Sequence, residues 1–352
     1  MSILGNMLIL LCIFLVTFIM TFMMKKYLFS RNLLVIPGLR SSHEKPKPQG
    51  GGLTIILSST ISLFFLNSFE IIEVNKFIFF ILPGLLVAFI GFWDDFLGVK
   101  PYVRLLIHSF SACLGVYLIG GFPIISFLEY NLDLGILGII LGLIYVVWMT
   151  NLYNFMDGID GLASLEAIFV FSTFSVISYF ILFDPTLSFL LLVLCASIFG
   201  FLVLNFPKSQ IFIGDVGSGF LGIVIALVSI SSSQSHPELF WTWLILLGIF
   251  LVDSTYTLIV RVFLKEKFYL PHSTHAYQKL ARSINSHWKT SALLVAINLL
   301  WLAPIAFLVA LNTIEGIYGV LLAYTPLVLL VYYLNAGQPD NLDLQKKHSN
   351  DI

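Results

Sequence analysis

Charged side chains are scarce in this chain of 352 residues. Asp, Glu, Lys and Arg make up 11% of it, whereas an average soluble domain carries about 25%. Hydrophobic residues make up 59%, and the mean hydropathy is +0.98. Intrinsic disorder requires low hydrophobicity and high net charge, so this composition excludes it. The shortage of charge indicates a polytopic membrane protein.

An excess of positive charge and a cysteine framework are also missing. The formal net charge of −1 provides no field for binding nucleic acid. Cys12, Cys113 and Cys195 lie in separate apolar runs without the spacing of a disulfide or a metal site. We therefore expect three small buried side chains. Lys25 and Lys26 follow the first apolar run and no cation precedes it, which predicts a retained span instead of a signal peptide.

Long apolar runs fill most of the chain. A helix needs about 20 apolar residues to cross the hydrocarbon core of a bilayer. Eleven segments meet this length approximately: 3–24, 52–68, 76–93, 103–120, 134–150, 161–182, 187–204, 217–231, 239–262, 290–311 and 316–334. The sequence predicts an all-α integral membrane protein with ten or eleven transmembrane helices. Residues 1–335 form one polytopic domain in this prediction, and residues 336–352 form a flexible cytoplasmic tail.

The loops between these segments differ in charge from one side to the other. If the N-terminus is outside, every Lys and Arg except Lys76 falls in a loop on the inner side. Such loops are cytoplasmic under the positive-inside rule. We therefore predict an outside N-terminus and a cytoplasmic C-terminus.

The inner loops also hold unusual polar motifs. The loop at 40–52 places Arg40, His43 and Lys45 before three consecutive glycines, which lets cations and backbone N–H groups approach a phosphate. A plain positive-inside loop with a flexible hinge explains the pattern equally well. The third segment ends in Asp94 and Asp95, and two adjacent carboxylates at a membrane boundary need a nearby cation or proton.

Two further motifs contribute oxygen-bearing side chains. Asn151, Asn154, Asp157 and Asp160 recur every three residues after the fifth segment, so on a helical turn they share one face. Asn205 ends the seventh segment, and Asp215 follows between glycines, a setting that favours an ion or a phosphate. These are hard ligands suited to Mg²⁺, which usually takes one or two protein carboxylates together with substrate phosphates.

Several polar residues leave alternatives open. His272 and His275 have Zn²⁺-ligand spacing but no third ligand, so hydrogen bonding to a phosphate or a sugar is favoured. Asp253 is an acid within an apolar segment and is therefore a functional candidate, whereas for Glu166, near the inner end of its segment, capping or pairing is an alternative. They motivate a rival hypothesis from another class, a proton-coupled secondary transporter, although its expected internal repeat is not seen.

The order of these motifs resembles the polyprenyl-phosphate N-acetylhexosamine-1-phosphate transferases of glycosyl transferase family 4. The motifs are Asp-Asp at 94–95, Asn-x-x-Asn-x-x-Asp-Gly-x-Asp-Gly from 151, Gly-Asp-x-Gly-Ser from 214 and His-Ala-Tyr-Gln from 275. The resemblance implies a bacterial inner-membrane enzyme with its active site on the cytoplasmic face. Its reaction would join a UDP-N-acetylamino sugar to undecaprenyl phosphate, giving undecaprenyl-diphospho-sugar and UMP.

The resemblance also implies roles for individual residues. It implies catalytic roles for Asp94, Asp95, Asp157 and Asp160, and metal binding by Asn205 and Asp215. Mg²⁺ is the implied ion, with Mn²⁺ as an alternative. The implied substrate-binding residues are Arg40, His43, Lys45, Asn151, Asn154, His272, His275 and Arg282.

Within this family, the 40–52 loop and the His-Ala-Tyr-Gln motif most resemble the branch that initiates O-antigen synthesis. Gln49 and Ser273 depart from that pattern, because Arg is expected at both positions. A phospho-MurNAc-pentapeptide transferase of peptidoglycan synthesis is the alternative within the family. The choice of sugar, attack by the lipid phosphate directly or through an aspartyl intermediate, and a monomer or a homodimer all stay open.

Overall fold

Helices make up most of the protein. The structure is a computed structural model, and it describes residues 3–35, 46–70, 77–128, 130–266 and 272–339. Its long helices are α1 (Ile3–Ser30), α2 (Gly52–Ser68), α3 (Ile78–Leu97), α4 (Pro101–Ile119), α5 (Gly135–Phe155), α6 (Leu162–Phe180), α7 (Pro185–Asn205), α8 (Gly214–Ser232) and α14 (Gly316–Tyr333). The shorter ones are α9 (Glu238–Leu246), α10 (Gly248–Phe263), α11 (Ala276–Ile284), α12 (His287–Ile297), the π-helix η2 (Asn298–Leu302) and α13 (Ala303–Ala310).

All eleven apolar segments expected from the sequence correspond to helices. Within the described residues, nine helices are long and apolar enough to span a membrane, counting α12 to α13 as one continuous helix. The pair α9 and α10, which is bent by 74°, meets the same criteria only when the two helices are taken together, as one broken span or a re-entrant loop. The remaining segment is α2, an apolar helix of 17 residues. The predicted all-α multi-pass membrane fold is therefore confirmed.

Two spans contain irregular turns that the sequence pattern did not predict. The segment 239–262 is predicted as one span, but it forms two helices, α9 and α10, with a bend at Leu247 between them. The segment 290–311 passes through the π-helix η2 just before Pro304, near the start of α13. Proline lacks the N–H that would continue the helical ladder, so a widened turn before it has a physical cause.

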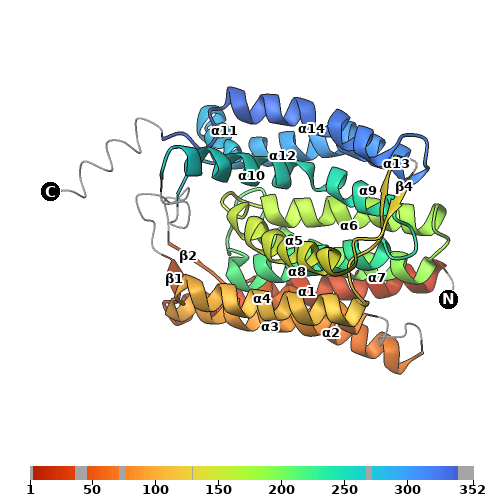
Figure 1. The fold of residues 1–352 in the computed structure, drawn as a ribbon. Coiled ribbons are helices and arrows are strands. Elements are labelled where there is room, and N and C mark those ends of the chain that lie inside the picture. Colours follow the sequence, from red (N-terminus) through yellow and green to blue (C-terminus); the bar gives the residue numbers. More distant parts are fainter. Residues whose placement is uncertain (1–2, 36–45, 71–76, 129, 267–271, 340–352) are drawn as a thin grey trace.

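The core of the bundle is built from α6, α7 and α8, which occupy its centre in Figure 1. In the most apolar stretch of α8, 89% of the residues are buried, whereas in α1 only 17% are. The outer helices expose long apolar side chains such as Leu11, Leu15 and Ile19 of α1. Such a surface is suited to lipid.

Cys12 and Cys113 correct one expectation from the sequence. Both were predicted to be buried, but only Cys195 is; Cys12 and Cys113 are exposed on α1 and α4. A helix on the outside of a membrane bundle is apolar on the side that faces lipid as well as on the side that packs against other helices. An apolar run therefore does not reveal which of its residues are buried.

Small strands mark the two ends of the bundle. Strands β1 (Leu34–Val35) and β2 (Lys47–Pro48) pair near one end, where α11 also lies. The hairpin of β3 (Ile125–Phe127) and β4 (Tyr130–Leu132) lies at the other end, where the Trp241 indole N–H donates to the Ser126 carbonyl oxygen (2.6 Å). Helix α1 starts at the β3–β4 end and α14 finishes at the β1–β2 end (Figure 1).

Candidate active site

A polar cavity of about 260 Å³ lies at the β1–β2 end of the bundle. It collects side chains from segments that are far apart in the sequence: the β2 region, the loop after α5, the end of α7, the start of α8, and helices α11 and α12. The lining residues are Val35, Gln49, Asn154, Asp157, Gly158, Ile159, Asp160, Asn205, Phe212, Gly214, Asp215, Gln278 and His287. The cavity brings together five of the predicted site residues: Asn154, Asp157, Asp160, Asn205 and Asp215.

Asp95 binds the N-terminus of α8. The N–H groups of Asp215 and Val216 donate to its carboxylate at 2.8 and 3.2 Å, and the Gln49 amide donates to it at 2.5 Å. The first N–H groups of a helix have no partner within the helix, and the helix dipole favours an anion there. Asp95 therefore fixes the start of α8, and with it the position of Asp215.

Arg104 connects the two other carboxylates at this point. Its guanidinium pairs with Asp94 and, at 2.8 Å, with Asp215. Asp94 also accepts the Val99 N–H at 2.6 Å, which closes the end of α3. Arg104 lies on α4, so α3, α4 and α8 meet through one ion-pair network.

The loop after α5 carries two carboxylates in different environments. The helix ends at Phe155, so Asp157 and Asp160 lie in a turn and not on the helical face that their spacing suggested. Within the described part of the chain, no donor or cation contacts the Asp157 carboxylate. Burial and the nearby charges of Asp215, Asp95 and Asp160 raise the pKa of Asp157 well above its ordinary value.

Asp160 has cationic neighbours instead. Lys47 Nζ lies 3.5 Å and His287 Nδ1 lies 3.6 Å from its carboxylate oxygens. Burial raises its pKa, but His287 and the Lys47 charge outweigh burial, so the pKa of Asp160 lies below its ordinary value. The cavity therefore holds one carboxyl group whose ionisation is unfavourable, that of Asp157, and one whose negative charge is compensated by nearby cations, that of Asp160.

Two asparagines add neutral oxygen atoms. Asn205 donates its amide N–H to Ser209 Oγ (3.3 Å) and to the Ile211 carbonyl oxygen (2.9 Å), which leaves its Oδ1 as the atom for a ligand. Asn154 donates to Ser218 Oγ at 3.1 Å. Asn151 does not line the cavity; its amide donates to the Val147 carbonyl oxygen of its own helix at 2.7 Å.

This set of donors fits Mg²⁺ bound together with a substrate. Among the described residues, no three His, Cys, Asp or Glu side chains are grouped closely enough to hold a metal alone. A magnesium ion usually retains substrate phosphates and waters as ligands and takes only one or two protein carboxylates. Asp215 and the Asn205 oxygen meet that requirement, and Asp157 adds a further carboxyl oxygen in the same cavity.

Of the remaining predicted substrate-binding residues, those that the structure describes, His272, His275 and Arg282, do not line the cavity. His275 is buried, with Nδ1 3.1 Å from Asp253, and it stacks on His272 with ring centroids 4.9 Å apart. Arg282 donates to the Ser273 carbonyl oxygen at 2.9 Å. Their predicted contacts with substrate stay predictions. Arg40, His43 and Lys45 lie outside the described residues.

Sequence reasoning did not assign four residues of this region to the site. Gln278 and His287 line the cavity, Lys47 pairs with Asp160, and Arg104 pairs with Asp94 and Asp215. Lys47 lies in the 40–52 loop and Gln278 lies in the His-Ala-Tyr-Gln motif, so the sequence motifs already indicated both positions. Arg104 and His287 lie in the first turns of two other helices, α4 and α12, and only the packing of those helices brings them to the site.

Known proteins resemble this chain in sequence over the part that includes most of the cavity residues. Residues 77–233 match the model of glycosyl transferase family 4. The chain is 28% identical over 255 residues to a protein of Bacillus subtilis named probable undecaprenyl-phosphate N-acetylglucosaminyl 1-phosphate transferase, covering 71% of this chain and 70% of that protein. It is 30% identical over 227 residues to a phospho-N-acetylmuramoyl-pentapeptide-transferase of Streptococcus pneumoniae, covering 61% of this chain and 67% of that protein.

Proposed function

This chain belongs to glycosyl transferase family 4, and we propose that it is a UDP-N-acetylhexosamine:undecaprenyl-phosphate N-acetylhexosamine-1-phosphate transferase. At the coarser level it is a polyprenyl-phosphate sugar-1-phosphate transferase and a multi-pass membrane protein. The proposed products are undecaprenyl-diphospho-sugar and UMP.

The observation that supports this function is the position of the cavity. At one end of a membrane bundle, it gathers five side chains. Two are carboxyl groups with opposite pKa shifts, Asp157 and Asp160, and a third carboxyl group lies at the start of α8, Asp215. The other two are the amides of Asn154 and Asn205. A water-soluble nucleotide sugar and the phosphate of a membrane lipid meet at such a boundary. We place this end of the bundle on the cytoplasmic face of a bacterial inner membrane.

The proposed reaction forms one P–O bond and breaks another. An oxygen of the lipid phosphate attacks the β-phosphorus of the UDP-sugar, and the bond from that phosphorus to the bridging oxygen breaks. The bridging oxygen leaves with UMP. Both reactants are anions, so the protein must lower their repulsion and align them, which is most of what phosphoryl transfer requires.

The residues of the cavity suit these tasks. Lys47 and His287 stand beside Asp160 and are placed to attract a diphosphate into the cavity. Arg104 supplies a further positive charge between Asp94 and Asp215. Asp95 holds the start of α8, so its contribution includes the position of Asp215.

We propose Mg²⁺ as the cofactor, held by Asp215 and Asn205. When bound, the ion neutralises phosphate oxygens and stabilises the charge that develops on the leaving group. Mn²⁺ has the same preference for hard oxygen ligands and is the alternative.

We propose that this transfer of a sugar 1-phosphate to the lipid begins O-antigen synthesis, on the motifs at 40–52 and 275–278. The similarity to a phospho-N-acetylmuramoyl-pentapeptide-transferase favours a second candidate, transfer of phospho-MurNAc-pentapeptide in peptidoglycan synthesis. Both candidates use the same chemistry and differ in the sugar.

Release of UMP tests the proposal directly. Purified protein is incubated with undecaprenyl phosphate, Mg²⁺ and one donor from a panel: UDP-GlcNAc, UDP-N-acetylfucosamine, UDP-N-acetylquinovosamine or UDP-MurNAc-pentapeptide. We expect lipid-dependent UMP from one N-acetylamino sugar, and none after EDTA treatment or in Asp215→Ala. Absence of UMP with every donor would overturn the proposal. Turnover with the pentapeptide donor alone would assign the protein to the second candidate.

A further inference from the structure

Asp253 is an acidic residue of a membrane helix for which the proposed reaction has no use. It lies on α10 with only 3% of its side chain exposed, and it does not line the 260 Å³ cavity. A carboxyl group within a membrane segment is costly unless its oxygens have partners. Its contacts therefore indicate what it is there to do.

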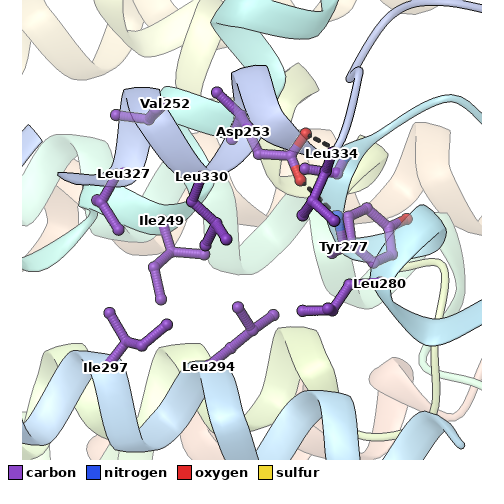
Figure 2. Close-up of a pocket in the computed structure, with 12 residues that line it drawn as sticks. Ile249, Val252, Asp253, Tyr277, Leu280, Leu294, Ile297, Leu327, Leu330 and Leu334 are labelled. Atoms are coloured by element: carbon purple, nitrogen blue, oxygen red, sulfur yellow. Dashed lines mark hydrogen bonds between the residues drawn. The ribbon is translucent and has the colours of Figure 1, made fainter. Parts of the chain in front are cut away.

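Four donors converge on the Asp253 carboxyl group. The N–H groups of Ala276 and Tyr277 lie 3.0 and 2.8 Å away, and Thr257 Oγ1 and His275 Nδ1 lie 3.0 and 3.1 Å away. Figure 2 shows its oxygens directed at the backbone that begins α11. Asp253 thus supplies, from another helix, the acceptor that an N-cap side chain normally provides.

The small apolar cavity beside Asp253 does not offer another explanation. It measures about 20 Å³ and is lined by apolar side chains such as Ile249, Leu294 and Leu327 (Figure 2). That volume is close to the minimum needed for one water molecule. The contacts of Asp253 therefore point to α11 and not to a ligand in this cavity.

Helix α11 forms part of the wall of the polar cavity. Gln278 lines that cavity, and the Tyr277 hydroxyl donates to the Phe155 carbonyl oxygen (2.9 Å) at the end of α5. A Cβ added to Gly158 would lie 2.1 Å from the Tyr277 hydroxyl oxygen and 3.0 Å from Gln278 Nε2. Because α11 and the loop carrying Asp157 are in such close contact, a shift of one displaces the other.

The far side of α11 is anchored as well. Lys279 Nζ donates to the carbonyl oxygens of Asn335 (2.7 Å) and Gln338 (2.9 Å), beyond the end of α14. The Gly337 N–H donates to the Thr274 carbonyl oxygen at 2.9 Å. Helix α11 is therefore held between α10, α14 and the site loop, and Asp253 holds the end nearest the site.

We propose that Asp253 is a positioning residue that fixes the N-terminus of α11, and so sets Tyr277 and Gln278 against the loop bearing Asp157. Its effect on turnover rests on the proposed transferase function. Its effect on α11 does not, and the two are measured separately.

Hydrogen exchange measures the structural half of the proposal. In Asp253→Ala we expect the amides of residues 276–278 to exchange at least about ten-fold faster, because two of them lose their acceptor. The Asp215 and Val216 amides, held by Asp95, should exchange as in wild type. Asp253→Asn keeps one acceptor oxygen, so a smaller increase is expected. Unchanged exchange in α11 in both variants would overturn the proposal.

Asp184→Ala provides a matched control. Asp184 also accepts two N–H groups at a helix start, from Thr186 (3.0 Å) and Leu187 (2.9 Å), but it caps the end of α7 opposite Asn205. We expect turnover of UDP-GlcNAc, or of whichever donor the panel identifies, to fall about ten-fold in Asp253→Ala and less than two-fold in Asp184→Ala. Equal losses would show a general effect on stability and overturn the positioning role.

A double-mutant cycle with Gln278→Ala tests the route of the effect. If Asp253 acts through α11, the two changes share one mechanism, and the double variant should lose about as much turnover as the worse single variant. Losses that multiply would overturn the route through Gln278. If wild type shows no turnover with any donor, the transferase proposal fails, and hydrogen exchange still decides whether Asp253 holds α11.

Discussion

Asp157 and Asp160 show how two identical side chains three residues apart acquire different properties. Asp157 has carboxylates as neighbours, and Asp160 has Lys47 and His287. The difference arises from the packing of β2 and α12 against one side of the loop. The spacing of the two residues in the sequence contains no information about it.

Replacing each of these carboxylates should change stability in opposite directions. The pKa of Asp157 is raised, so its favourable contribution is complete below the ordinary Asp value and is lost as the pH rises. Asp157→Asn should therefore raise the unfolding temperature of the substrate-free protein at pH 8, by about 2 °C. The advantage should disappear near pH 4.

Asp160→Asn is the matched comparison. The pKa of Asp160 is lowered, so its contribution is present above the ordinary Asp value and is lost as the pH falls. This variant should unfold below the wild-type temperature at pH 8, and the gap should close in acid. Thermal scanning of the three proteins in detergent at pH 4.5 and pH 8 measures both effects. Shifts of the same sign would contradict the environments described for the two carboxylates.

At the scale of elements, helix starts organise the site. Asp95 holds the start of α8 from α3, and Asp253 holds the start of α11 from α10. In both cases the side chain comes from another helix, so the two helices cannot move independently. Sequence-based capping rules look for the cap immediately before the helix, and they do not detect an acceptor that arrives from a distant segment.

Gly214 is required by this arrangement at α8. Its φ is +73°, and a Cβ there would lie 2.4 Å from Asp95 Oδ2 and 2.9 Å from the Gly50 backbone nitrogen. Gly120 also has positive φ, at +95°, but a Cβ there meets nothing within 4 Å. Both Gly→Ala changes cost the left-handed strain of about 1 kcal/mol, and only Gly214→Ala adds the collision.

We therefore expect a clear difference between Gly214→Ala and Gly120→Ala. Gly120→Ala should keep near wild-type turnover with a slightly lower unfolding temperature. Gly214→Ala should lose at least about 100-fold in turnover, because the shift displaces Asp95 and Asp215 together. UMP release and thermal scanning on both proteins provide the measurement. Similar activities would show that the contact of Gly214 with Asp95 is not needed for the reaction.

The sequence predicted where the helices lie better than it predicted the bends and irregular turns within them. Hydropathy located all eleven apolar helices because a span needs a minimum apolar length, and that length is visible locally. The bend at Leu247 interrupts a continuous apolar run, so hydropathy does not reveal it. In the site, Asp94 and Asp215 lie in recognisable motifs, whereas Arg104 pairs with both only because α4 packs beside α3 and α8.

At the scale of the whole molecule, charge separates the two ends. The described cations Lys47, Arg104 and Arg282 lie at the end with the polar cavity, and the opposite end holds the β3–β4 hairpin with Asp133 beside it. The cavity acids also gather at one end instead of at mid-depth, where a transporter would place them. Asp253 and Glu166, which motivated the transporter hypothesis, bind α11 and Asn298.

This asymmetry predicts the orientation of the protein in the membrane. Positive loops stay in the cytoplasm, so the β3–β4 hairpin should be outside and α11 inside. The test starts from a variant in which Cys12, Cys113 and Cys195 are replaced, because the first two are exposed. One cysteine is then introduced at an exposed position of each end, by Asn131→Cys in β4 or Ser283→Cys in α11. A membrane-impermeant maleimide should label Asn131→Cys in intact cells, and should label Ser283→Cys only after the membrane is opened. Labelling of both variants in detergent controls for reactivity. The reverse pattern in intact cells would place the cavity outside, where a cytoplasmic nucleotide sugar could not reach it.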